Sequence, residues 1–454
     1  MNTVDVLKKK VVGLENTFLL ILAGGIGSRL IGIGSKEVPK QFAIANELGE
    51  TWIQITVKRF LDFGIMPKNV VVITTNSSQT ALAENQLAKL DVLNSNICQI
   101  ASNYDYAGAM IKGSEFIKNL DSDALVINTP ADQYVEADDI FYSTLSKAVK
   151  SASQGKPTII GVRTSDLNLI KGCGHAVYSK GDLNESKKVI EFIEKPKGER
   201  AEDILKSDNS AINTGISVWT TKTLFEQASN LIQNKRLEDL KKVKRAFAIK
   251  EAEVLASREE SVSVGVPLTK EEADSITKNI LSEVDGWSIS TDQLMEVFDD
   301  LYVSIGSFVW EDCGTYSSIY KVSKKTPDTK NAKIGGGKYE VIHCAKNLFF
   351  VPEGYHLAGY GLQDSFVAIN TIYGRTVVVA GKLNNSQLLK EFGEEFGPGL
   401  ADKRTYMIDS INNHVQKTMV GDLMVCFVGL NNHSVSAVRL TDGDIFVSVS
   451  NDAF

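Results

Sequence analysis

The first third of the chain alternates short apolar runs with longer stretches of helical spacing. Continuous apolar runs are typical of strands that are buried on both faces of a sheet. Strands separated by helices of 10–15 residues indicate a mostly parallel, doubly wound α/β sheet. We predict strands at 18–23, 70–74, 97–101, 124–128 and 158–162, and helices at 52–60, 79–90, 107–119 and 138–151.

The pattern changes twice further along the chain. The middle is rich in Lys, Glu, Leu and Ala, and predicts a helical lobe over 237–258 and 270–283. After a polar, glycine-rich segment, β-branched and aromatic runs recur at 348–351, 366–369, 377–379, 423–429 and 445–449, with one short helix at 385–392. We therefore expect an N-terminal extension (1–16), an α/β domain (17–324), a linker (325–337) and a smaller β-rich C-terminal domain (338–454).

Composition excludes several classes of protein. The 49 Lys and Arg against 56 Asp and Glu give a net charge of −7 over 454 residues, which argues against nucleic acid as the main partner. No apolar run reaches the roughly 18 residues of a membrane span. Residues 1–17 lack the apolar segment of a signal peptide, and the five cysteines have no metal or redox spacing. We expect a cytoplasmic protein with reduced thiols.

The first predicted strand ends in a glycine-rich loop, Ala23-Gly24-Gly25-Ile26-Gly27-Ser28-Arg29-Leu30. Such a loop lets main-chain N–H groups approach phosphate oxygens, and Arg29 adds a permanent planar cation. A tight turn with solvated cations is an equal alternative for the loop alone. The second basic motif, Pro39-Lys40-Gln41-Phe42, favours phosphate binding. Neither the P-loop nor the dinucleotide-binding fingerprint is present.

Together these motifs resemble the start of the sugar-1-phosphate nucleotidyltransferases, and Pro-Lys-Gln-Phe is similar to the bacterial mannose-1-phosphate guanylyltransferases. The similarity covers roughly 17–380, with further segments in the family's order: Pro130-Ala131-Asp132-Gln133, Phe192 to Pro196, Asn213 to Ile216 and Trp310 to Tyr316, and more loosely Ser290 to Asp292 with Glu296. The resemblance implies the nucleotide-diphospho-sugar transferase fold, a Rossmann-like doubly wound mixed sheet.

The resemblance also implies a reaction and the residues that perform it. A sugar 1-phosphate oxygen attacks the α-phosphorus of a nucleoside triphosphate and pyrophosphate leaves, so catalysis is mainly positioning and charge neutralisation. The implied catalytic residues are Arg29, Lys40 and Asp132, and Asp132 and Asp312 would hold Mg²⁺. The implied nucleotide-binding residues are Ala23, Gly24, Gly25, Gly27, Ser28, Arg29, Lys40 and Gly108. Those implied for the sugar phosphate are Glu194, Lys195, Asn213 and Gly215.

Each of these residues also has a purely structural interpretation. Asp132 follows a predicted strand, where ligands bind at the carboxyl edge of an α/β sheet, but it could instead cap a helix or a turn. Asp312 follows the apolar stretch 303–310, which we predict to be a strand, but it could instead be a turn residue before Gly314. Glu194-Lys195 could be a charged surface turn ended by proline. Asn213 and Gly215 could form a turn before a strand. The order of the motifs along the chain favours the functional interpretation.

Three segments depart from the family pattern. Ile31-Gly32-Ile33-Gly34-Ser35 replaces Trp-Pro-Leu-Ser, and 103–109 lacks the Asn-Thr-Ala triplet of guanylyltransferases. Gly172-Cys173-Gly174-His175 stands where Tyr-Gly-Tyr is usual, and we interpret Cys173 as a packed thiol rather than a nucleophile.

We expect an enzyme that joins GTP and mannose 1-phosphate, or a related hexose or heptose phosphate, to make a nucleotide sugar such as GDP-mannose for polysaccharide biosynthesis. Two alternatives stay open. One is the same reaction with CTP, UTP or dTTP, and the other is a regulatory paralogue that binds nucleotide sugar without making it. We expect a protein without membrane or nucleic-acid partners, and a homo-oligomer is the commoner outcome for soluble enzymes.

Overall fold

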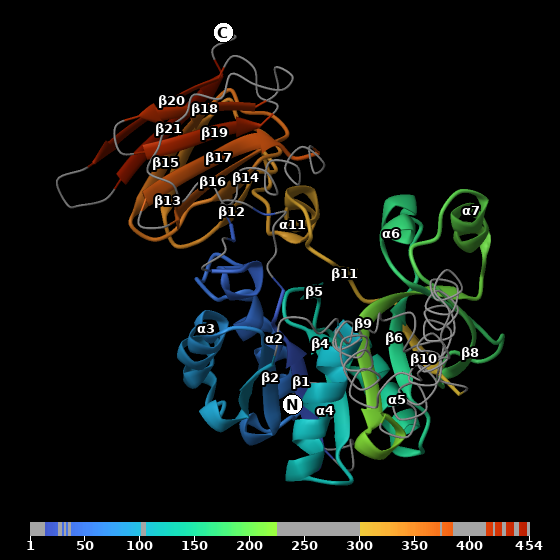
Figure 1. Ribbon diagram of the computed structural model, residues 1–454. Helices are drawn as coiled ribbons and strands as arrows, with labels where there is room; N and C mark the ends of the chain where they lie inside the picture. The colour runs from blue at the N-terminus through green and yellow to red at the C-terminus, as the bar shows by residue number, and fades with distance from the viewer. Residues whose placement is uncertain are drawn as a thin grey trace, which may run out of the picture.

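The computed structural model describes residues 14–25, 30, 33–34, 38–100, 106–224, 300–372 and 375–384, together with four C-terminal strands (Figure 1). The predicted helices at 237–258, 270–283 and 385–392 lie outside the described residues, and so does the segment from Ser290 to Glu296. No helix among the residues described is both long and apolar enough to cross a bilayer.

A nine-stranded mixed sheet organises the first part of the chain, with the strand order β3-β2-β1-β4-β9-β6-β10-β8-β7. The first four of these strands are parallel, β6 is parallel to β10, and β9 runs antiparallel to β4 and β6. The sheet confirms the predicted α/β class. Its strands are β1 (Thr17–Leu22), β2 (Val70–Thr74), β3 (Ile97–Gln99), β4 (Leu125–Pro130), β6 (Thr158–Val162), β7 (His175–Tyr178), β8 (Lys187–Ile193), β9 (Ser210–Thr220) and β10 (Tyr302–Gly306).

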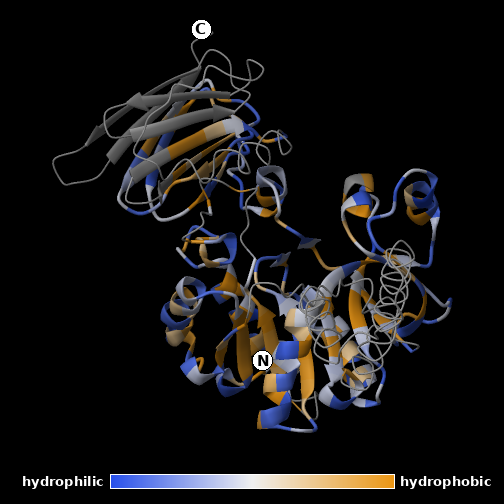
Figure 2. Cartoon of the chain, viewed as in Figure 1, coloured by the Kyte–Doolittle hydropathy of each residue, from blue (hydrophilic) through white to orange (hydrophobic). Residues whose placement is uncertain are grey.

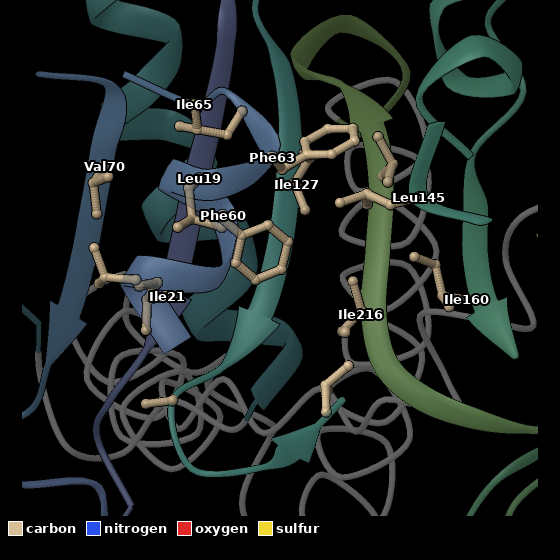
Figure 3. Packing of buried hydrophobic residues seen from close by; sticks show 14 of the residues in the cluster. Leu19, Ile21, Phe60, Phe63, Ile65, Val70, Ile127, Leu145, Ile160 and Ile216 are labelled. Atoms are coloured by element: carbon tan, nitrogen blue, oxygen red, sulfur yellow. The ribbon is translucent and has the colours of Figure 1, made fainter. Parts of the chain in front are cut away.

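Helices cover both faces of this sheet, which explains the continuous apolar runs. Leu19 and Ile21 of β1 belong to a core with Phe60 and Phe63 (Figure 3). Leu20 packs on the opposite face with Met110. The described helices of this part are α2 (Trp52–Phe63), α3 (Ser77–Leu87), α4 (Tyr106–Leu120), α5 (Asp139–Ser153), α6 (Leu167–Gly172) and α7 (Glu199–Lys206).

The stretch 303–310, which resembles one strand in sequence, forms two. β10 ends at Gly306, and the chain then leaves the large sheet and forms β11 (Trp310–Glu311) against β5 (Tyr134–Val135). Apolar spacing cannot show this break, because Phe308 and Trp310 are buried although they lie outside the large sheet. The break carries Asp312 toward Asp132.

The C-terminal part contains a six-stranded sheet and a four-stranded sheet (Figure 1). The residues of one buried cluster include Phe349 and Val367 of the first sheet and Leu357 of the second. β12 lies inside the predicted linker 325–337. It pairs with β14, and its Ala332 and Ile334 are buried. The strands are β12 (Ala332–Ile334), β13 (Lys338–Ile342), β14 (Leu348–Phe350), β15 (Tyr355–Tyr360), β16 (Ser365–Ile372), β17 (Arg375–Lys382), β18 (Val415–Val420), β19 (Leu423–Val428), β20 (His433–Arg439) and β21 (Ile445–Asn451).

A further apolar core joins the two parts. It unites Leu30, Ile33 and Trp52 of the α/β part with Ile334 and Phe366 of the β-rich part. Helix α11 (Tyr316–Val322) lies between them, and its Tyr316 ring stacks on Phe366 with 3.7 Å between ring centroids. Hydrophobic colour is concentrated on the interior strands, and the exposed loops are mostly hydrophilic (Figure 2).

Candidate active site

The side chain of Lys40 joins three segments that are far apart in sequence. Lys40 begins a short 3₁₀ helix after Pro39 and is only 3% exposed. Its Nζ donates to the main-chain oxygens of Asp132 at 2.7 Å and Asp312 at 3.1 Å, and pairs with Asp132 Oδ2 at 3.0 Å. The ammonium therefore brings two of the predicted carboxylate residues to one point.

The pairing of β5 with β11 fixes the same two residues from the other side. The Gln133 side-chain oxygen accepts a hydrogen bond from the Trp310 indole at 3.1 Å. Immediately after Asp312, Cys313 is fully buried and has a left-handed backbone with φ of +53°. Asp132 keeps 35% of its side chain exposed, so one of its faces is free to meet a ligand.

Lys40 brings two aspartates, Asp132 and Asp312, to one point of the fold. Among the residues described, no group of three or more His, Cys, Asp or Glu could hold a metal ion. Mg²⁺ is usually held by one or two protein carboxylates plus waters and substrate phosphates, rather than by a complete protein cage. Asp132 and Asp312 match that donor set.

Two glutamine side chains donate hydrogen bonds to the main-chain oxygens at the start of the glycine loop. Gln41 donates from its amide to the Ala23 oxygen at 2.6 Å and the Gly25 oxygen at 2.8 Å. Gln79 donates to the Gly24 oxygen at 3.3 Å. With its carbonyls bound to the protein, the loop can direct N–H groups at an anion.

Only part of the predicted nucleotide-binding set lies in the described chain. A Cβ at Gly24 would lie 2.5 Å from Thr75 Cγ2, so a larger residue here would force the Thr75 side chain to move. Gly108 is buried in the first turn of α4. Gly27, Ser28 and Arg29 lie outside the residues that the structure describes.

The predicted sugar-phosphate residues come from two strands of the large sheet, β8 near one edge and β9 next to β4. Glu194 and Lys195 follow β8 and pair with each other at 3.2 Å. Gly215 in β9 has a φ of +77°, and its N–H donates to the Asn213 side chain at 3.1 Å. Strand β7 pairs with both β8 and β9, and His175 of β7 lies opposite Ile193 and Ile212. This pairing holds the end of β8, before Glu194, near the start of β9, before Asn213.

Two of these supporting contacts were missed by the sequence reasoning. Tyr106 donates to the Gly215 oxygen at 2.9 Å and accepts from the Asn128 amide at 3.0 Å, which ties β9 to α4 and β4. Gln41 stands within the quoted Pro-Lys-Gln-Phe motif, but nothing in its spacing indicates which carbonyls it would reach. Tyr106 is preceded by residues without a clear pattern, and no signal identifies it.

The Cys173 thiol is close enough to feel the charges of both Asp312 and Glu194. Burial, together with the nearby charges of Asp312 and Glu194, raises the pKa of the Cys173 thiol to about 12. The thiol therefore stays protonated near neutral pH, as a packed thiol does. Burial lowers the pKa of the neighbouring His175, whose Nδ1 lies 3.0 Å from the Cys173 oxygen.

A family model described as nucleotidyl transferase matches residues 19–329. A mannose-1-phosphate guanylyltransferase from Escherichia coli is 26% identical over 358 residues, which is 78% of this chain and 70% of that protein. One of the same name from Sinorhizobium fredii is 25% identical over 398 residues, 86% of this chain and 69% of that protein.

A crystal structure described as a mannose-1-phosphate geranyltransferase from Thermus thermophilus superimposes with a TM-score of 0.59 at 19% identity. It covers 85% of this chain and 98% of that one, which shows a shared fold.

Proposed function

The chain belongs to the nucleotidyl transferase family, and we infer that it joins a nucleoside triphosphate to a sugar 1-phosphate, with release of pyrophosphate. The single observation that carries this inference is the contact of Lys40 with Asp132 and Asp312. It assembles three predicted motifs around one charged centre, as a reaction between two anions requires.

The nucleotide half of the site neutralises and orients the triphosphate. We propose that the N–H groups of the loop from Ala23 to Ser28 bind its phosphates, with Arg29 and Gly108 alongside. Lys40 cannot move far, because its ammonium already bonds three oxygens. We propose that its charge lowers the energy of the crowded transition state and keeps the two aspartates in place.

We propose that Asp132 and Asp312 hold Mg²⁺, in a family that is generally dependent on divalent metal. When bound, the cation would neutralise phosphate oxygens and make the α-phosphorus a better electrophile. The two residues would contribute oxygen ligands from one end of the antiparallel β5–β11 pair, which the Gln133–Trp310 hydrogen bond also holds together.

The sugar half of the site lies across the sheet. We propose that Glu194 accepts hydrogen bonds from sugar hydroxyls and that Lys195 pairs with the sugar phosphate. Asn213 and Gly215 would line the sugar pocket. Lys195 is 63% exposed, so its ammonium can leave Glu194 for a phosphate at little cost.

We propose GTP and mannose 1-phosphate as the substrates, with a related hexose or heptose phosphate as the second candidate sugar. The names of the relatives and the Pro-Lys-Gln-Phe motif support this pair. The product would be GDP-mannose for polysaccharide biosynthesis, made in the cytoplasm, and we propose a homo-oligomer. CTP, UTP or dTTP stay as alternative nucleotides because 103–109 lacks the Asn-Thr-Ala triplet.

Pyrophosphate release with four nucleoside triphosphates and a panel of sugar 1-phosphates, with and without Mg²⁺, tests the proposal. We expect the fastest release with GTP and mannose 1-phosphate, and none without the cation. Fastest release with another nucleotide would overturn the base assignment alone. Binding of nucleotide sugar without turnover of any pair would instead support a regulatory paralogue, which the altered loop 31–35 keeps as a candidate.

A further inference from the structure

A cavity of about 300 Å³ lies between the α/β part and the β-rich part, on the side of Trp52 and Gln133 next to the proposed active site. Helix α2, the loop 45–48, helix α11 and strand β12 form its walls. None of the residues that we assign to the nucleotide, the sugar phosphate or the metal lines it. Its volume is at the lower end of the range for small-molecule sites.

One wall of this cavity holds a buried cation without a counter-ion. Arg59 is 4% exposed, and its guanidinium makes one hydrogen bond within the described chain, from Nη2 to the Gln133 oxygen at 3.3 Å. A guanidinium has five N–H donors. The Arg59 Nε is buried with no partner, and no carboxylate among the described residues forms an ion pair with this side chain.

A buried unpaired charge is costly for a protein to keep. Burial lowers the pKa of Arg59 to about 10, which still leaves it charged at neutral pH. The indole N–H of Trp52, a second polar group in the lining, is likewise buried without a partner. Both residues line the cavity, so an anion bound there would lie beside the unpaired guanidinium.

The remaining lining sets the character of that acceptor. Lys324 and Lys333 join Arg59 in the lining, and Glu47 is the one carboxylate there, 3.4 Å from the Lys324 ammonium. This cationic excess stands out in a chain whose net charge is −7. The other walls are largely apolar, with Ile55, Ile319, Val322 and Ile334.

We propose that this cavity binds a small organic oxyanion, in which a carboxylate or phosphate faces Arg59 and an apolar or planar body packs against the aliphatic wall. Planar guanidinium groups match both oxyanions through paired hydrogen bonds. This site goes beyond the proposed catalysis, and its test does not depend on which nucleotide or sugar the enzyme uses.

Thermal unfolding of the full chain with phenyl phosphate, benzoate and neutral benzamide tests the proposal. We expect a concentration-dependent rise in the melting temperature with phenyl phosphate or benzoate and none with benzamide. The anion that gives the larger rise in melting temperature shows whether the cavity prefers a phosphate or a carboxylate ligand. Arg59→Met should weaken the binding at least about tenfold, as loss of a charged hydrogen-bond partner does.

Two controls locate the response. Lys195→Ala, in the proposed sugar-phosphate site, should leave the anion-induced shift unchanged, and Lys333→Ala in the cavity wall should weaken it even if Arg59→Met does not fold. Anion binding should also change the tryptophan fluorescence of the protein, and Trp52→Phe should remove that change. No shift with either anion, an equal shift in Arg59→Met, or a shift lost only in Lys195→Ala would overturn the proposal.

Discussion

At the scale of single residues, the candidate site depends on unusual backbone positions beside its functional groups. Lys195, Gly215 and Cys313 have φ values of +44°, +77° and +53°. Non-glycine residues reach this region at a cost of order 1–3 kcal/mol and keep it only where their surroundings hold them. Cys313 is held by full burial and by the contact of Lys40 with the preceding Asp312 oxygen.

Gly215→Ala should raise KM for the sugar 1-phosphate by about tenfold or more, because the new methyl group would add strain of about 1–2 kcal/mol. Its Cβ would lie 3.0 Å from Pro130 Cγ, in a backbone that side chains rarely adopt. Gly155→Ala is a matched control, since its φ is +79° with nothing within 4 Å of the Cβ. Steady-state kinetics check both variants, and equal KM changes in the two would contradict a role for Gly215 in the sugar pocket.

Asp132→Asn should lower kcat by at least about 10²-fold, the size of effect expected from losing a key electrostatic contact. The amide keeps the shape of the side chain but removes the charge that pairs with Lys40 at 3.0 Å. Asp203→Asn, on the exposed surface of α7, should leave kcat unchanged. Pyrophosphate release measures both variants, and near-normal turnover of Asp132→Asn would remove this residue from the proposed metal site.

At the scale of elements, apolar patterning predicts what is buried within one sheet and fails where long-range pairing decides. Strands β2 and β6 match their predicted bounds, because every residue in them is buried. The stretch 303–310 was wrongly predicted as one strand, since nothing local indicates that Trp310 leaves the large sheet to pair with Val135.

The same limit applies to the candidate site. Motif order predicts that Lys40, Asp132 and Asp312 lie together, and the Lys40 contacts join them. The amide contacts of Gln41 and Gln79 with the glycine loop depend on three-dimensional distances that spacing does not contain. The missing counter-ion of Arg59 is equally invisible: helical spacing places Arg59 on the buried face of α2 with Trp52 and Phe63, but it does not show which charges lie nearby.

Protonation of His175 on β7 should destabilise the strands that hold Glu194. Burial lowers the pKa of His175, so the unfolded chain takes up this proton at a higher pH than the folded protein. Stability from this residue is therefore present above the unfolded pKa of about 6.5 and is lost as the pH falls below it. Urea unfolding at pH 7.5 and 5.5 should show a smaller acid-induced loss in His175→Gln than in the unaltered protein. An equal loss in both would contradict the role of His175.

At the scale of the whole molecule, the β-rich part is packed onto the α/β part through the core around Phe366. Trp52 belongs to this core, and the ammonium of Lys40 lies 5.2 Å from the centroid of the Trp52 ring. Helix α11 begins at Tyr316, four residues after Asp312, and stacks on Phe366. The core that joins the two parts therefore also supports the residues around the proposed metal site.

Phe366→Ala should lower the free energy of unfolding by about 3–5 kcal/mol, the cost of removing a buried phenyl ring. Phe366 is 1% exposed and its ring stacks on Tyr316 at an interplanar angle of 11°. Because Tyr316 follows Asp312 closely, thermal inactivation of the enzyme should shift to lower temperature together with unfolding. Ile342→Ala, at a position 60% exposed in the same β-rich part, should change the free energy of unfolding by less than about 0.5 kcal/mol. If calorimetry of Phe366→Ala showed an early transition of the β-rich part while the inactivation temperature stayed unchanged, the two parts would be energetically independent and the proposed support of the site would be wrong.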